Sequence, residues 1–143
     1  MNTRAICERI GGSWTERSFG FWKRAAPEVI RPAALVLRAV GARLSSIVAC
    51  EEPGGGARLS WHWDLEGTLF SIEATIAAGA EAPSLVDIYP GADWAERETY
   101  DYYAVMFEGR GATPSLVLAR GDSPGILKGL SCADERSDKK CPT

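Results

Sequence analysis

The most constraining feature of the sequence is a stretch near its middle in which apolar and polar residues alternate. Trp61 and Trp63 alternate with polar side chains, and a period of two is typical of a β-strand with one buried face. Glu66-Gly67 follows as a tight turn, and residues 69–76 provide a second apolar arm. The pattern predicts a β-hairpin whose tryptophan face lies in the core and whose His62 face is solvent-facing.

Segments on either side of the hairpin complete the expected fold. Residues 28–40 carry apolar side chains at spacings of three and four, which predicts an amphipathic helix. A second helix is expected over 94–105, and Asp93 with Glu96 predicts a capping box at its start. We therefore expect an α+β fold with helices packed on one face of a small, mostly antiparallel sheet of three to four strands. The expected strands lie around residues 44–50, 58–65 and 68–77.

The chain of 143 residues is long enough for one domain with its own core. We expect an N-terminal aromatic segment over 1–26 with no clear period, a single domain over 27–130, and a charged, mobile tail over 131–143. The aromatic segment either folds back on the core or forms an exposed interaction patch. Its large aromatic residues are Trp14, Phe19, Phe21 and Trp22.

Charge and hydropathy exclude several classes of protein. A net charge of −3 argues against a dedicated nucleic-acid binder. The longest apolar run, residues 33–37, is far shorter than the roughly 20 residues that a membrane-spanning helix needs. The N-terminus lacks the long apolar region of a secretory signal. We therefore expect a cytoplasmic chain that spans no membrane.

The cysteines and the single histidine, His62, offer no recognisable metal site. Zinc and iron–sulfur sites need closely spaced thiolates or imidazoles, and no two cysteines form a C-x-x-C pair. We expect no metal and no bound cofactor, and we interpret the four cysteines as plain thiols. They are Cys7, Cys50, Cys132 and Cys141.

The second expected helix has two chemically different faces when its residues are placed at 100° intervals. One face is mainly apolar, and the other combines Trp94 with Arg97, Glu98 and Asp101. A solvated face with a weak ion pair is the plainer interpretation of these charges. A tryptophan among charged residues, however, suits a contact surface better.

A free-standing enzyme is the rival hypothesis, with Glu98 or Asp101 acting together with His62. Two carboxylates on one turn of a helix are poorly placed to flank a bond. The sequence also has no nucleophile motif, phosphate loop or nucleotide fingerprint. We assign no catalytic residue. A third hypothesis is an assembly factor that binds a catalytic subunit only transiently.

The second expected helix also carries a family signature. The run YPGADWAERETYD at residues 89–101, followed by FEG at 107–109, resembles the signature of the thirty-kilodalton subunit of respiratory complex I, also called its C subunit. That family also supplies subunits of membrane-bound, energy-converting nickel–iron hydrogenases. The resemblance is strong over about residues 83–109 and loose over 28–82.

The chain departs from the family pattern in and after this helix. The family usually has glycine where Ala104 stands, and it continues Gly-His-Pro-Asp-Leu-Arg-Arg where residues 109–116 read GRGATPSL. The histidine and the arginine pair are missing. These departures favour the hydrogenase branch, including carbon-monoxide-linked hydrogenases, over an ordinary NADH–quinone complex.

The resemblance implies a non-catalytic, cofactor-free subunit that supports electron transfer in a membrane-bound oxidoreductase. It would lie peripherally on the cytoplasmic face of the inner membrane, with no membrane span of its own. Its implied partners are a large catalytic subunit, of the quinone-reducing or nickel–iron type, and a neighbouring iron–sulfur subunit. The implied partner interface consists of Trp94, Glu96, Arg97, Glu98, Asp101, Phe107 and Gly109.

Overall fold

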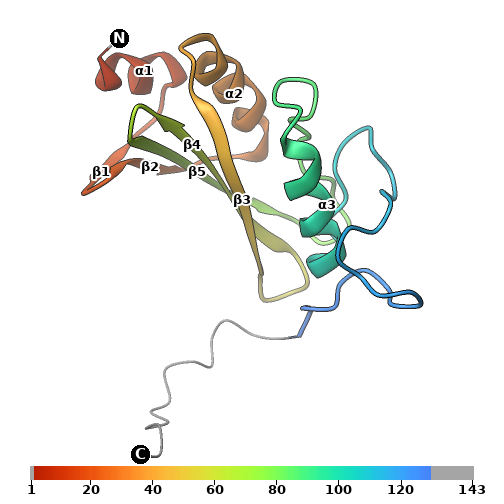
Figure 1. Cartoon of the computed structure of the whole chain (residues 1–143). Coiled ribbons are helices and arrows are strands. Elements are labelled where there is room, and N and C mark those ends of the chain that lie inside the picture. Colours follow the sequence, from red (N-terminus) through yellow and green to blue (C-terminus); the bar gives the residue numbers. More distant parts are fainter. Residues whose placement is uncertain (1, 130–143) are drawn as a thin grey trace, which may run out of the picture.

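The computed structural model describes residues 2–129, which form a five-stranded sheet with helices packed against it (Figure 1). Three α-helices and five strands follow one another along these residues, with a 3₁₀ turn before the second helix. In chain order they are α1 (Thr3–Ile10), β1 (Thr15–Arg17), β2 (Gly20–Arg24), η1 (Pro27–Val29), α2 (Ile30–Ala39), β3 (Arg43–Glu51), β4 (Ala57–Leu65), β5 (Thr68–Ile76) and α3 (Ala92–Tyr103).

The sheet has the order β1-β2-β5-β4-β3. Neighbouring strands are antiparallel except for β2 and β5, which run parallel. The predicted α+β class is confirmed, and so are the three strands predicted from the alternating pattern. The expected count of three to four strands is too low, because β1 and β2 come from the N-terminal segment for which no period was visible.

Close backbone approach explains how the short strand β2 joins the sheet. Gly20 pairs with Leu69 of β5, and a Cβ atom at Gly20 would overlap the Leu69 carbonyl group. Only glycine fits there, since it has no side chain. A strand of five residues beginning with glycine gives little periodic signal, which is why the sequence pattern did not reveal it.

The N-terminal segment folds back on the core. Phe21 stacks on Phe70 with ring centroids 5.7 Å apart, and Trp14 meets the same ring edge-on at 6.2 Å. Lys23 is buried, and its ammonium donates to the Gly11 carbonyl at 2.7 Å just beyond α1. These contacts fix α1 and β2 to the sheet.

The central hairpin is confirmed in register and in orientation. Trp61 pairs with Ile72 and Trp63 with Phe70, and all four side chains are fully buried. His62 points to the opposite face, as the alternation predicts. It is partly buried, however, and its Nδ1 lies 2.8 Å from the Ser71 hydroxyl oxygen on the neighbouring strand.

The helix predicted over 28–40 is present as η1 followed by α2. Its buried residues are spaced by three and four as expected: Ile30, Ala33, Ala34 and Leu37. Pro32 lies in the first turn of α2, where its missing N–H breaks no helical hydrogen bond. Within residues 2–129, no helix is long and apolar enough to cross a membrane.

Candidate interaction site

Glu96, in the first half of α3, is a buried carboxylate with 1% of its surface exposed. It accepts hydrogen bonds from the Ser84 hydroxyl at 2.9 Å and the Leu85 backbone N–H at 2.7 Å. Arg110 donates to it at 2.8 Å and also pairs with Asp93. A buried carboxylate needs such pairing, since losing a partner leaves an uncompensated charge. Glu96 therefore ties α3 to the loop before it and the segment after it.

The capping box predicted at Asp93 and Glu96 is wrong. Gly91 occupies the N-cap position and no side chain caps α3. Both carboxylates are directed to Arg110 instead. Burial lowers the pKa of Arg110, but the hydrogen bonds to Glu96 and Asp93 outweigh burial and raise that pKa above its ordinary value. The arginine therefore stays charged and holds both carboxylates.

Residues 113–127, here called the strap, run along α3 without regular secondary structure (Figure 1). Asp101 anchors the strap: its Oδ2 accepts the backbone N–H groups of Leu116 at 2.7 Å and Val117 at 2.8 Å. Its backbone carbonyl accepts the N–H of Gly125 at 2.8 Å. Burial alone would raise the pKa of Asp101, but the hydrogen bonds from the strap hold it below its ordinary value.

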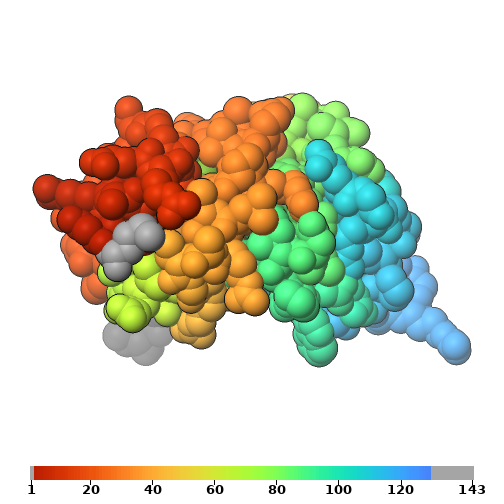
Figure 2. Space-filling model, turned by 90° about the horizontal axis from the view of Figure 1, so that it is seen from above, coloured from red at the N-terminus to blue at the C-terminus, as the bar shows by residue number. Residues whose placement is uncertain are grey.

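Arg97 contacts the strap one turn before Asp101. Its Nε donates to the Pro114 carbonyl at 3.0 Å and its Nη2 to the Ser115 carbonyl at 3.2 Å. Its third nitrogen lies 3.5 Å from Asp93. Arg97 thus binds backbone carbonyl groups of the strap, and Asp101, on the same face of α3, binds backbone N–H groups of the same strap. In Figure 2 the strap (cyan to blue) lies alongside α3 (green) at one end of the molecule.

Exposed apolar side chains gather on α3 and the strap. Trp94 is 67% exposed, Val117 46% and Ile126 45%. These are three of the six large hydrophobic side chains that are exposed in residues 2–129. Arg97 is partly exposed and Glu98 is exposed. We call these five residues, Trp94, Arg97, Glu98, Val117 and Ile126, the α3–strap surface.

The structure corrects the expected position of several interface residues. Asp101, placed by the helical periodicity on a face open to a partner, is fully buried under the strap. Glu96 is buried against Ser84 and Arg110. Phe107 is buried too, where it pairs with Ala82 in an isolated parallel bridge. These three residues contact their own chain.

The remaining residues of the expected interface are accessible. Trp94 and Glu98 are exposed, and Arg97 is half-buried. Gly109 is exposed with φ of 72°, a left-handed conformation that favours glycine. The residues that the sequence did not reveal are Arg110, Val117 and Ile126, which lie in a region without periodicity. Asp93 and Glu96 in the family signature need a cationic partner, and this need was the one feature of the sequence that could have indicated Arg110.

The structure does not bring His62 together with Glu98 or Asp101. His62 lies on the open face of the sheet and bonds to Ser71, whereas α3 packs on the core face that contains Trp61 and Trp63. The strap occupies the buried Oδ2 of Asp101. Burial lowers the pKa of His62. The catalytic arrangement considered for an independent enzyme is therefore wrong.

Metal-ligating side chains are dispersed in the part of the chain that the structure describes. Among residues 2–129, no three His, Cys, Asp or Glu side chains are placed to hold one metal ion. Cys7 and Cys50 are free thiols, and Cys50 Sγ lies 3.2 Å from the Arg58 guanidinium. Cys132, Cys141 and the tail expected over 131–143 lie outside the described residues.

Comparison with known proteins places these features in a family. Residues 24–125 match the family described as the respiratory-chain NADH dehydrogenase, 30 Kd subunit. This range runs from the end of β2 through all of α3 and most of the strap.

Individual relatives, all C subunits of an NADH-quinone oxidoreductase, match over shorter segments. The protein from Rhodopseudomonas palustris (strain BisB18) is 37% identical over 67 residues, which are 44% of this chain and 34% of the relative. The protein from Rhizobium rhizogenes (strain K84) is 53% identical over 38 residues, 27% of this chain and 19% of the relative. The protein from Mesorhizobium japonicum is 63% identical over 27 residues, which are 19% of this chain and 13% of the relative.

These alignments span about a third or less of each relative's length. The family match itself extends over most of the chain and includes the helix with its buried Glu96 and Asp101. The chain therefore belongs to the family of the 30 kDa subunit of the respiratory-chain NADH dehydrogenase.

Proposed function

We propose that this chain is a non-catalytic docking subunit in the cytoplasmic arm of a membrane-bound oxidoreductase related to complex I. It binds the large catalytic subunit through the α3–strap surface and lies next to an iron–sulfur subunit. It carries no cofactor and supports electron transfer by positioning its neighbours. The observation that carries this proposal is the exposure of Trp94, Val117 and Ile126 on one helix and its strap.

The chemistry of this surface suits protein contact. Tryptophan and arginine are the side chains that most often anchor protein–protein interfaces. Trp94 stands three residues before Arg97 on the same helix face, and Glu98 is exposed beside them. An apolar anchor within a charged rim is the composition expected of a specific, non-obligate interface.

Arg97 and Asp101 act in this proposal as positioning residues. They hold the strap through four hydrogen bonds to its backbone, made to Pro114, Ser115, Leu116 and Val117. Ordering a flexible segment at the moment of binding opposes association, by about 1–2 kcal/mol for each residue fixed. A strap that is ordered beforehand presents Val117 and Ile126 without that penalty.

The finer proposal concerns which oxidoreductase contains the chain. The altered segment over residues 109–116 supports the hydrogenase branch, whereas the relatives are named as parts of an NADH-quinone oxidoreductase. A tagged chain purified from membranes identifies the branch. We expect a stoichiometric complex whose large subunit contains nickel and iron. A large subunit without nickel contradicts the hydrogenase branch, and substoichiometric, transient capture favours an assembly factor over a resident subunit.

A further inference from the structure

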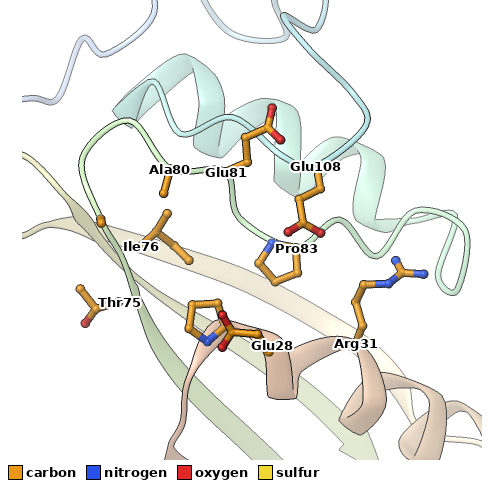
Figure 3. Close-up of a pocket in the computed structure, with 10 residues that line it drawn as sticks. Glu28, Arg31, Thr75, Ile76, Ala80, Glu81, Pro83 and Glu108 are labelled. Atoms are coloured by element: carbon orange, nitrogen blue, oxygen red, sulfur yellow. The ribbon is translucent and has the colours of Figure 1, made fainter.

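A groove of about 410 Å³ lies where three segments of the chain meet. None of the residues that line it belongs to the α3–strap surface. The start of α2 forms one wall, the end of β5 and the loop after it form the floor and a second wall, and Glu108 closes the third side (Figure 3). A lysine or arginine residue, backbone included, is smaller than this volume. The groove is therefore large enough to receive a side chain with part of its backbone.

The floor and inner walls of the groove are apolar. Pro27 lies at the start of η1, Ile76 ends β5, and Pro83 precedes the buried Ser84 and Leu85. Ala80 adds a methyl group from the loop. Such a surface covers the aliphatic part of a side chain better than a charged head group.

Three carboxylates surround this apolar floor. Glu28, Glu81 and Glu108 come from three different segments, and all three residues are exposed. Figure 3 shows Glu108 and Glu28 on either side of Pro83, with Glu81 above them and its carboxylate pointing away from Pro83 in this view. None of the three forms an ion pair within residues 2–129.

The cation among the lining residues, Arg31, is hydrogen-bonded to Asp87, and Glu108 attracts it without forming an ion pair. Arg31 is engaged by Asp87, which accepts two hydrogen bonds from its guanidinium at 2.8 Å and 2.6 Å. Arg31 also donates to the Ser84 carbonyl. Its charge is thus matched by Asp87, and the groove keeps a surplus of negative charge from Glu28, Glu81 and Glu108.

The wall that carries two of these carboxylates is fixed. Ala82 donates its N–H to the Met106 carbonyl at 2.8 Å and accepts the Glu108 N–H at 2.9 Å. This bridge sets Glu81 and Glu108 on adjacent backbone segments, close to where the strap begins. The backbone positions of Glu81 and Glu108 are therefore fixed relative to each other by two hydrogen bonds.

We propose that the groove receives a lysine or arginine side chain from the large catalytic subunit. The aliphatic stem lies on Pro27, Ile76 and Pro83, and the cationic head lies among Glu28, Glu81 and Glu108. Charge complementarity selects this occupant, since an anionic segment is repelled by the same carboxylates. The inference rests on the proposed function, because it requires the chain to sit in a multisubunit arm.

The experiment compares how two triple variants of the full chain bind to the large subunit. In the groove variant, Glu28→Gln, Glu81→Gln and Glu108→Gln remove three charges while conserving shape. In the control variant, Glu8→Gln, Glu16→Gln and Glu66→Gln remove three charges from α1, β1 and the β4–β5 turn, at the other end of β5. Retention on an immobilised, tagged large subunit is measured from low to high NaCl.

We expect the groove variant to be retained at least fivefold less than wild type at low salt and the control variant to match wild type. The difference in retention should shrink as the NaCl concentration rises, because dissolved ions screen the attraction between exposed charges. The screening length is about 10 Å at 0.1 M salt. Equal retention of groove variant and wild type overturns the inference. If wild type is itself not retained, the proposed function fails instead.

A second comparison tests whether the cation in the groove comes from the partner or from Lys139 and Lys140 of the chain itself. Both the wild type and the groove variant are prepared without residues 130–143. A fivefold difference that persists in the shortened pair supports a cation from the large catalytic subunit. A difference that disappears shows that the chain's own C-terminal segment is the occupant, which overturns the inference.

Discussion

The Asp101 carboxylate accepts the backbone N–H of Val117 at 2.8 Å, and this contact joins the buried side of α3 to a strap that has no secondary structure of its own. The same oxygen accepts the N–H of Leu116 at 2.7 Å. Hydrogen bonds to a charged acceptor stabilise by about 1.5–3 kcal/mol each. The Asp101 carboxylate is therefore a main anchor of the strap, beside Arg97 and the backbone carbonyl of Asp101 itself.

Replacing Asp101 with alanine should release the strap. The variant loses the acceptor for the N–H groups of Leu116 and Val117, and amides that lose their partner exchange with solvent through local opening. Hydrogen exchange followed by mass spectrometry should show the peptide over 113–120 exchanging at least tenfold faster, while the β4–β5 hairpin keeps its protection. Unchanged exchange in 113–120 would mean that other contacts hold the strap.

The Asp101 anchor should also depend on pH. Hydrogen bonds from the strap hold the pKa of Asp101 below its ordinary value of 3.8, so the folded chain binds fewer protons than the unfolded chain near that pH. The stability that Asp101 contributes is therefore fully present above about pH 4 and is lost as pH falls through the lowered pKa.

Thermal denaturation of wild type and Asp101→Asn between pH 3 and pH 7 measures this contribution. The difference in melting temperature should be largest near pH 7 and should shrink below about pH 4. Asn is the matched control because it conserves the shape of Asp but does not titrate. A difference that is constant across the whole range would contradict the assignment of the charge to Asp101.

The pair of Glu96 and Arg110 should be far more important for stability than an exposed pair. Arg110→Gln leaves the buried Glu96 without its cation, and breaking a buried ion pair on one side costs about 3–5 kcal/mol. Arg4→Gln disrupts the exposed pair with Glu16 and should cost at most about 1 kcal/mol. Urea unfolding of both variants provides the comparison, and similar losses for the two would show that Glu96 is not held by Arg110.

Substitutions on the two faces of β4 should destabilise the chain by different amounts. Trp61 is fully buried, so Trp61→Ala should cost about 3–5 kcal/mol. His62 has one hydrogen bond, to Ser71, on the open face, so His62→Ala should cost about 1 kcal/mol or less. Equal destabilisation in urea titrations would contradict the register of the hairpin.

Periodicity predicted those parts of the fold whose structure is set by a repeating apolar face. The hairpin around Trp61 and the helix around Leu37 were correct, since each buries one face against a single core. Strands β1 and β2 were missed because β1 has three exposed residues and β2 begins at a glycine that only the close approach of Leu69 explains.

The candidate site shows a different limit. The helical positions placed Trp94, Arg97, Glu98 and Asp101 on one side of α3, and Arg97 and Asp101 contact the same strap. Periodicity does not reveal what covers a face. The covering element is a strap held by its backbone groups, through Asp101 and Arg97. Backbone amides and carbonyls are the same in every sequence, so no side-chain pattern marked the strap.

The central claim is that the α3–strap surface binds the large subunit, and Trp94→Ala tests it most directly. Trp94 is 67% exposed, so the isolated variant should keep the stability of wild type within about 0.5 kcal/mol. Loss of an anchoring tryptophan from an interface costs about 2 kcal/mol or more, which corresponds to at least a tenfold loss of affinity. Leu35→Ala, at a 56% exposed position on α2, is the matched control.

The measurement is the amount of large subunit recovered with each tagged chain. The account predicts that Trp94→Ala recovers at least tenfold less large subunit than wild type, while Leu35→Ala recovers the same amount as wild type. Recovery of the large subunit by Trp94→Ala at wild-type stoichiometry would contradict the account and place the docking surface elsewhere on the chain.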